Sequence, residues 1–229
     1  MIEVRNVIKK YGRKKVLNGV SFTAEKGQIT CLIGVNGVGK TTIMKAIMGL
    51  TPINGGEILI DQKPLNHAMY ERIVFIPDTI AMPLQMKIRD CLQFMGDFYR
   101  NWNHVRAEEL LAFFKLDERD RLAELSRGNA AKINLLLGLS VDADYLLMDE
   151  PFSGIDMFSR EQIAKVFTGS LIEDRGVIIT THEINDIEHL LDKAVLFEQG
   201  KVLKEFGTEE MRLSAGKSVV DVMREVYQA

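Results

Sequence analysis

Residues 34–41 read GVNGVGKT and match the pattern G-x-x-x-x-G-K-[ST] of phosphate-binding loops. A strand-like apolar run at 29–33 leads into this loop and a helical pattern at 41–50 follows it, as such a loop requires. Glycines let successive backbone N–H groups point at one anion, and the helix start and Lys40 add positive charge. The sequence therefore predicts a phosphate site, where the Thr41 hydroxyl can ligate a bridging Mg²⁺. The loop alone does not name the reaction, because nucleotide kinases, GTPases and motor ATPases share it.

The order of strand-like and helical patterns around the loop predicts an α/β fold. Strand patterns dominate the first third of the chain, and the segment from 83 to 139 is helical. After it, strand and helix patterns alternate, which is typical of a mostly parallel sheet. We expect a single domain over residues 1–229, with a helical subdomain at approximately 79–140 inserted in the α/β core. The expected elements are strands at 3–8, 16–23, 57–60, 145–148, 177–181 and 194–197 and helices after Asp156 and Asn185.

Composition and charge limit the functional classes. The chain has 46% hydrophobic and 27% charged residues, as in an ordinary globular protein, and its net charge of −3 with scattered basic residues argues against a nucleic-acid partner. Cys31 and Cys91 lie in unrelated segments, which fits a reducing compartment. The longest apolar run, near 133–141, is far shorter than the roughly 20 residues that a membrane-spanning helix needs. The first residues do not resemble a secretory signal, so any membrane role is expected to come through a partner.

A second motif ends a later apolar strand. Residues 145–150 read YLLMDE, and a buried strand of the same sheet can deliver its terminal side chains to the phosphate loop. We expect Asp149 to bind Mg²⁺, directly or through water, and Glu150 to polarise an attacking water as the general base. The alternative interpretation is an acidic strand end without catalytic function that enters a turn at Pro151. The phosphate loop upstream argues against this alternative.

A third motif, LSRGN at residues 125–129, precedes an apolar segment at 133–139. In this arrangement the chain resembles the ABC ATPase family, whose signature LSGGQ occupies the same place. Arg127 and Asn129 depart from that signature, whereas its serine and its second glycine are kept. The resemblance spans nearly the whole chain. It implies the ABC ATPase fold, a P-loop NTPase core with a mostly parallel sheet, an N-terminal antiparallel β subdomain and an inserted α-helical subdomain.

The resemblance also implies roles for individual residues. Tyr11 looks like the aromatic residue that stacks on adenine, Asp156 ends an SGID segment that looks like the loop joining two active sites, and His182 looks like the switch histidine that contacts the γ-phosphate. Taken singly, Tyr11 could be an ordinary strand residue, Ser126 a helix N-cap and His182 a structural side chain. The implied catalytic residues are Lys40, Asp149, Glu150 and His182. The implied nucleotide-binding residues are Tyr11, Gly34, Asn36, Gly37, Val38, Gly39, Lys40, Thr41, Thr42, Ser126, Gly128, Asn129 and Asp156.

Asp78 is the main departure from the family. Residues 72–77, RIVFIP, look like the strand before the family's Q-loop, where the next residue is usually glutamine. An aspartate can still ligate Mg²⁺ or a water, but it adds a negative charge near Asp149 and Glu150 and, when ionised, donates no hydrogen bond. We expect the metal site to comprise Thr41, Asp149 and Asp78, with Asp78 coupling the nucleotide state to the partner.

By this resemblance the chain is expected to be the ATP-binding and hydrolysing subunit of an ABC transporter, with ATP and Mg²⁺ as cofactors. The family's signature faces the γ-phosphate of another subunit, so we expect a homodimer or heterodimer that buries two ATP molecules. A polytopic transmembrane permease is the expected partner, with no nucleic acid and no direct membrane insertion. The implied location is cytoplasmic, peripheral on the inner face of the cell membrane. The short tail after Phe206 looks closest to compact bacterial exporters, which favours export of a peptide, drug or lipid.

Two other functional classes stay open. A P-loop small-molecule kinase suits the length of the chain, but the LSRGN and SGID segments have no task in such an enzyme. A non-transport ABC ATPase of the DNA-repair or translation type resembles the chain in its motifs, but it would contain a long coiled-coil insertion or a second ATPase domain.

Two sets of apolar residues stand out in the helical segment. The first is expected close to one face of a helix and comprises Val105, Leu110, Leu111 and Phe114. The second recurs at four-residue spacing and comprises Phe94, Phe98 and Trp102. The second set is interpreted either as the core of the helical lobe or, by the family resemblance, as part of the groove that receives a short helix of the membrane subunit.

Overall fold

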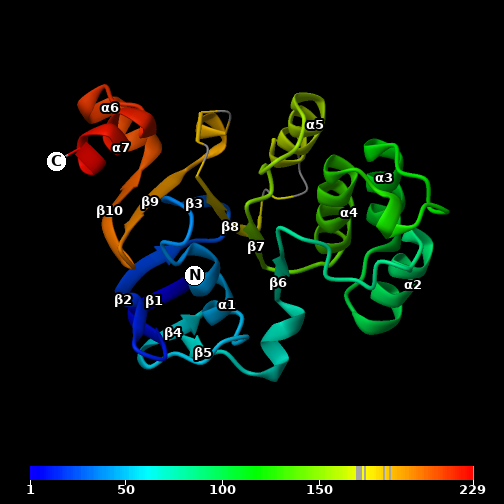
Figure 1. Cartoon of the computed structure of the whole chain (residues 1–229), viewed down its shortest axis with the longest axis horizontal. Helices are drawn as coiled ribbons and strands as arrows, with labels where there is room; N and C mark the ends of the chain where they lie inside the picture. The colour runs from blue at the N-terminus through cyan, green and yellow to red at the C-terminus, as the bar shows by residue number, and fades with distance from the viewer. Residues whose placement is uncertain (169–171, 173, 183, 186, 229) are drawn as a thin grey trace.

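Two β-sheets organise the chain in the computed structural model, which describes residues 1–168, 172, 174–182, 184–185 and 187–228 (Figure 1). The smaller sheet is antiparallel with the order β2-β1-β4-β5, and the larger sheet has the order β10-β9-β3-β8-β7-β6. The smaller sheet contains β1 (Ile2–Tyr11), β2 (Lys14–Ala24), β4 (Gly55–Ile60) and β5 (Lys63–Pro64). The larger sheet contains β3 (Ile29–Ile33), β6 (Ile73–Ile76), β7 (Tyr145–Asp149), β8 (Gly176–Thr181), β9 (Lys193–Glu198) and β10 (Lys201–Gly207).

The larger sheet is parallel except where β10 pairs with β9. Strands β3, β7 and β8 are buried along their whole length, as expected for parallel strands that are covered on both faces. Their register brings the strand ends level, because Ile33 pairs with Thr181 and Asp149 pairs with Thr180. The loops that follow these strands therefore leave from one edge of the sheet, which is where open α/β sheets bind their ligands.

Helices cover both faces of the larger sheet. Helix α1 (Lys40–Ile47) packs between the two sheets, and the opposite face shares a hydrophobic cluster with α4 (Arg127–Leu139), α5 (Met157–Phe167) and α7 (Val219–Gln228). The other helical elements are α2 (Ile88–Phe98), α3 (His104–Phe114), α6 (Thr208–Ala215) and the 3-10 helices η1 (His67–Glu71), η2 (Leu122–Glu124) and η3 (Glu188–Leu190). Within the described ranges, no helix is both long enough and apolar enough to cross a membrane.

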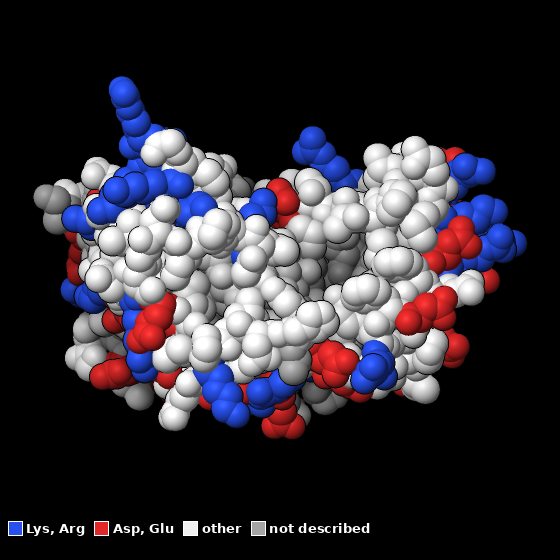
Figure 2. All heavy atoms as spheres, turned by 90° about the horizontal axis from the view of Figure 1, so that it is seen from below, with Lys and Arg blue, Asp and Glu red and all other residues white. Residues whose placement is uncertain are grey.

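The helices α2, α3 and α4 lie between β6 and β7 in the chain and gather at one end of the molecule (Figure 1). Helix α4 contacts β6, α2 and α3, so it links this end to the sheet. The face shown in Figure 2 is notched between this end and the end that contains the sheets. The assignment of residues 79–140 as an inserted subdomain of one domain stays a prediction, and the hydrophobic cluster that these helices share with the sheet supports it.

The predicted strands are present, and the α/β class with a mostly parallel sheet is confirmed. Two details differ from the expectations. Val105 is exposed, because the buried face of α3 is formed by residues such as Ala107 and Leu110 and Val105 lies on the other side. The helix expected after Asn185 is only the 3-10 turn η3 in the described residues of that stretch, because the chain returns to the sheet at Lys193 and leaves room for a single turn.

Candidate functional site

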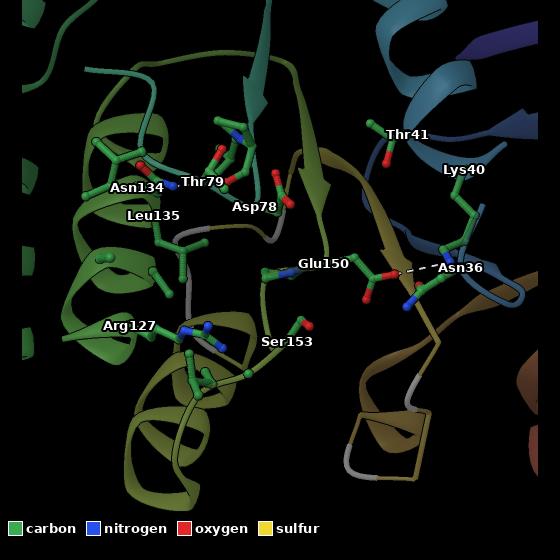
Figure 3. Close-up of a pocket in the computed structure, with 18 of the residues that line it drawn as sticks. Asn36, Lys40, Thr41, Asp78, Thr79, Arg127, Asn134, Leu135, Glu150 and Ser153 are labelled. Carbon is green, nitrogen blue, oxygen red and sulfur yellow. Dashed lines mark hydrogen bonds and ion pairs between the residues drawn. The ribbon is translucent and has the colours of Figure 1, made fainter. Parts of the chain in front are cut away.

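A cleft of about 870 Å³ opens at the edge of the larger sheet, between the phosphate loop and α4 (Figure 3). On the loop side its lining includes Asn36, Gly37, Gly39, Lys40, Thr41 and Thr42. The remaining lining includes Asp78, Arg127, Asn134, Glu150, Ser153 and His182. The structure therefore brings the predicted phosphate loop, the predicted base, the predicted switch histidine and Asp78 into one cleft.

Two glycines with positive φ angles shape the backbone of the phosphate loop. Gly39 precedes α1 with φ 116°, and an added Cβ would lie 2.9 Å from the Leu17 side chain. Gly37 also has a left-handed conformation, with φ 81°. The Val38 side chain is buried in the core below the loop, and its N–H donates to the Val35 carbonyl oxygen at 3.3 Å. Val38 therefore anchors the loop through its side chain, and the glycines beside it give the loop its shape.

Glu150 lies in the cleft between two other predicted catalytic residues. Its Oε1 atom is 3.1 Å from Lys40 Nζ, and its Oε2 atom is 2.9 Å from His182 Nδ1. The Lys40 ammonium group also donates to the Gly34 carbonyl oxygen at 2.6 Å. Glu150 has φ 49°, a region that side chains disfavour, and its N–H donates to Thr180 Oγ1 at 2.9 Å. Strand β8 thus holds Glu150 in a strained backbone conformation, with its carboxylate pointing toward the phosphate loop (Figure 3).

Asp149 lies buried at the end of β7, directly before Glu150. Thr180 Oγ1 donates to its Oδ1 atom at 2.5 Å, and Thr41 also hydrogen-bonds to it. Burial raises the pKa of Asp149 above its usual range; the two hydroxyl groups lower this pKa, and the Asp78 and Glu150 carboxylates raise it. Among the residues with described placement, no group of three or more His, Cys, Asp or Glu side chains is arranged to hold a metal ion. A cation here would need further oxygen ligands, such as the Thr41 hydroxyl.

Thr180 is a site residue that sequence reasoning missed. Its hydroxyl accepts a hydrogen bond from the Glu150 N–H and donates one to the Asp149 carboxylate, so it positions both acidic residues. The sequence held a signal for it, because Thr180 is a hydroxyl residue directly after the apolar residues 177–179 of a predicted strand, and the structure buries it fully. A buried hydroxyl needs a hydrogen-bond partner, which makes such a residue a candidate for a positioning role.

Four predicted nucleotide-binding residues at the starts of α4 and α5 lie outside the lining of the cleft. Ser126 caps α4, and its Oγ accepts from the Asn129 N–H at 3.2 Å. Asp156 caps α5, and its Oδ1 accepts from the Ser159 N–H at 2.9 Å. Gly128 lies between the caps, since an added Cβ would be 2.5 Å from Ser159 Oγ and 3.0 Å from Asp156 Oδ2. The two helix starts therefore abut, and the N-cap interpretation of Ser126 is confirmed.

Tyr11 also lies outside the lining of the cleft. It ends β1 and is 51% exposed. Its hydroxyl group is 3.2 Å from Thr51 Oγ1, and Lys9 Nζ is 4.7 Å from the ring centroid. The ring is therefore held at its tip and open to the surface, which leaves it available for stacking.

Known proteins resemble this chain over most of its length. Residues 17–153, more than half of the chain, match the model of the family described as ABC transporter. The Nod factor export ATP-binding protein I of Burkholderia lata is 32% identical over 213 residues, which cover 89% of this chain and 70% of that protein. The petrobactin import ATP-binding protein YclP of Bacillus subtilis is 31% identical over 226 residues, which cover 92% of this chain and 88% of that protein.

The fold is also that of a solved protein. A structure described as the ATP binding subunit of an ABC transporter has a TM-score of 0.87 to this one at 23% sequence identity, over 99% of each chain. The fold, the cleft and the family match agree, and the chain belongs to the ABC transporter family as an ATP-binding subunit whose ATP hydrolysis powers transport.

Proposed function

We propose that the cleft binds ATP together with Mg²⁺ and that Glu150 is the general base of hydrolysis. The observation that supports this most directly is the contact between Lys40 and Glu150. Lys40 ends the phosphate loop, so the terminal phosphate is expected beside its ammonium group, and the Glu150 carboxylate lies 3.1 Å from that group. A water between the carboxylate and the phosphate would give its proton to Glu150. His182, 2.9 Å from the other carboxylate oxygen, orients the base.

Thr41 and Asp149 are the residues that would hold Mg²⁺, with Asp78 beside them. Both offer the oxygen ligands that Mg²⁺ prefers, and they already hydrogen-bond to each other. Burial and the neighbouring carboxylates raise the pKa of Asp149, and a divalent cation at this place would offset the electrostatic cost of its negative charge. With ATP bound, Mg²⁺ supplies positive charge to the terminal phosphate oxygens.

The signature residues support a dimer. ABC transporter ATP-binding subunits dimerise, and Ser126, Gly128, Asn129 and Asp156 lie outside the cleft of their own chain. The start of α4 presents the Ser126 hydroxyl and the positive end of a helix dipole, which suits an anion. We propose that these residues contact the ATP that a second subunit holds, in a homodimer or a heterodimer. The exposed ring of Tyr11 is proposed to stack on adenine.

The proposed membrane partner is a polytopic permease, because ABC transporter ATP-binding subunits work with membrane components. The chain would then lie in the cytoplasm on the inner face of the membrane. Phe94 and Phe98 of α2 are 47% and 68% exposed and stack with centroids 5.9 Å apart, whereas Trp102 is buried. The two phenylalanines are therefore our proposal for the surface that meets the permease, and Trp102 belongs to the core.

Export is our proposal for the direction of transport, on the likeness to the Nod factor export protein. Import is the alternative outcome of a transport assay, since the petrobactin import protein is about equally similar. A small-molecule kinase is inconsistent with the family to which the chain belongs.

A mixing experiment tests both the base and the dimer. Glu150→Gln keeps the size of the side chain but removes the base, so hydrolysis should fall about 10²- to 10⁴-fold while ATP binding remains. Ser126→Ala should also lose hydrolysis. When the two variants are mixed, some dimers contain one site with an intact Glu150 and an intact Ser126, so phosphate release should partly return.

The control for this experiment is Ser214→Ala, because Ser214 is exposed on α6 and its hydroxyl donates to the Glu210 carbonyl oxygen of the same helix. It should leave phosphate release unchanged. A mixture as inactive as its two components would contradict a site shared between two copies of this chain. Unchanged hydrolysis by Glu150→Gln would contradict the proposed base.

A further inference from the structure

The Tyr227 side chain of helix α7 hydrogen-bonds to the ends of β3 and β9, next to the start of the phosphate loop. The Tyr227 hydroxyl group lies 3.1 Å from the Ile33 carbonyl oxygen and 3.0 Å from the Phe197 carbonyl oxygen, so its one proton is shared between two acceptors. Ile33 is the last residue of β3 and directly precedes Gly34, and Phe197 lies in β9 beside it. Burial raises the pKa of Tyr227 to about 12, so the hydroxyl stays protonated and acts as a donor at neutral pH.

One of these carbonyl groups, that of Phe197, also packs against Gly34, the first residue of the phosphate loop. Gly34 lies so close to β9 that an added Cβ would be 2.7 Å from the Phe197 carbonyl oxygen. The Gly34 carbonyl oxygen in turn accepts the hydrogen bond from Lys40 Nζ at 2.6 Å. A shift of the β3 and β9 ends would therefore move Gly34, and with it the acceptor that orients the Lys40 ammonium group.

The other end of α7 is bonded to the segment that follows His182. The Val219 N–H, at the start of α7, donates to Glu188 Oε1 at 2.7 Å, and Glu188 begins η3. Val219 and Val222 are buried in the hydrophobic cluster on this face of the larger sheet. Figure 1 shows α7 at the end of the molecule where β9 and β10 lie. Helix α7 thus spans from the histidine segment to the base of the phosphate loop.

We propose that Tyr227 is a positioning residue for ATP binding, whose hydroxyl group holds the ends of β3 and β9 in the arrangement that aligns Gly34 and Lys40. Tyr227 acts through the strand ends and does not touch the nucleotide. The inference rests on the proposed function, in that the loop is taken to bind ATP.

The test is Tyr227→Phe in the full chain, which keeps the ring and its packing and removes the hydroxyl alone. We expect the dissociation constant for ATP and the KM for hydrolysis to rise together by about 3- to 10-fold, the range expected for the loss of one hydrogen bond. The kcat at saturating ATP should change by less than about twofold, because Glu150 and His182 are untouched. Amide hydrogen exchange at residues 34–40, measured without nucleotide, should become faster.

The matched control is Tyr70→Phe. The Tyr70 hydroxyl also donates to a backbone carbonyl oxygen, that of Met48 at 3.2 Å, but it does not touch the strand ends. Tyr70→Phe should leave the KM for ATP and the amide hydrogen exchange at residues 34–40 unchanged. The proposal is overturned if Tyr227→Phe lowers thermal stability but leaves KM and loop exchange at the values of Tyr70→Phe. If the wild-type chain does not hydrolyse ATP, the proposed function fails separately, and the exchange of the loop still decides the role of Tyr227.

Discussion

The proposed nucleotide site has two sides, which are held in place by different kinds of contact. The phosphate-loop side contains Lys40, Glu150 and His182, and the signature side contains the starts of α4 and α5. On the phosphate-loop side, side chains that follow three different strands meet, with Glu150 in contact with Lys40 and His182. On the signature side, Ser126 and Asp156 each bond to the backbone of the helix that they begin. One side is assembled by long-range contacts within the chain, and the other consists of two local helix caps that pack together.

This difference suggests how the reaction is controlled. The groups that we propose for hydrolysis meet inside one chain, because Glu150 is in contact with both Lys40 and His182. The signature side is formed by helix caps within the chain, and the residues there that we propose contact ATP lie outside the lining of their own cleft. Hydrolysis would then depend on bringing two subunits together, and substitutions on each side separate the two contributions.

Among the substitutions that test how each side is held in place, Gly128→Ala has the largest expected effect, because it disturbs the contact between the two caps. The added methyl group would lie 2.5 Å from Ser159 Oγ and 3.1 Å from Ser159 Cβ, so rotation of the hydroxyl relieves only part of the overlap and the two helix starts would have to shift. We expect the free energy of unfolding to fall by about 1–3 kcal/mol. Hydrolysis should fall about 10- to 100-fold as the signature moves. Urea denaturation and phosphate release measure the two effects.

Gly207→Ala is the control for that substitution, since an added methyl group there meets other atoms only at 3.7 Å or beyond. Gly207→Ala should lower the free energy of unfolding much less than Gly128→Ala does. Combining Gly128→Ala with Ser159→Ala removes the nearest atom, so part of the lost stability should return. If Gly128→Ala were as stable as the wild type, the helix starts would not abut as described.

Thr180→Val probes the phosphate-loop side, with a smaller expected effect on hydrolysis. The substitution keeps the shape of the side chain but removes the hydroxyl that bonds to both acidic residues; the Glu150 N–H keeps the Thr180 carbonyl oxygen at 3.2 Å, and Asp149 keeps its bond to Thr41. We expect a loss of about 1–3 kcal/mol in the free energy of unfolding and about tenfold slower hydrolysis. The hydroxyl lowers the pKa of Asp149, so its removal should raise that pKa and move the acid limb of the pH–rate profile to higher pH.

Thr30→Val is the matched control on the adjacent strand β3. Thr30 is also fully buried, but its Oγ1 atom has no hydrogen-bond partner in the part of the chain that is described. The valine should therefore be neutral or stabilising, opposite in sign to Thr180→Val. Equal stability changes in the two variants would mean that the Thr180 hydroxyl does not hold the acidic residues.

The smallest expected effect concerns the opposite end of β7. Burial raises the pKa of Asp61, but hydrogen bonds from the Met1 amino group, Tyr145 and Arg72 outweigh burial and hold this pKa well below its usual range. A carboxyl group with a lowered folded pKa contributes stability above its unfolded pKa of about 3.9, and that stability is lost as the pH falls through the folded pKa. Asp61→Asn should therefore cost about 1 kcal/mol or less at neutral pH, since the side chain is partly exposed.

Denaturation curves recorded from neutral to acidic pH measure this effect, and Asp61→Asn should flatten their acid limb. Asp149 is the natural comparison, because its pKa is raised and its charge costs stability at neutral pH. Asp149→Asn should leave the nucleotide-free protein at least as stable at neutral pH while hydrolysis is lost. An acid limb that is the same in wild type and Asp61→Asn would count against the role of this network.

Much of the fold and of the phosphate-loop side could be predicted from local patterns. The loop at 34–41 is contiguous, and the two acidic residues directly follow an apolar strand, so neither depends on knowing the fold. The error at Val105 shows the limit of periodicity, since an apolar residue near a helix start fits a buried stripe in the sequence and still faces solvent. The pairing of Thr180 with Asp149 was out of reach, because β7 and β8 are buried throughout and no alternation indicates their register.

The residue types along the chain were sufficient to identify a phosphate-binding α/β protein with an acid pair, because consecutive residues in a loop or at a strand end are held together by the backbone itself. The tertiary structure decided which groups support them: the Thr180 hydroxyl between two acids, the space left at Gly128 for α5, and the Tyr227 hydroxyl under the phosphate loop. These contacts join residues that are far apart in the chain. Strand register and helix packing alone bring them together, and a local pattern cannot encode either.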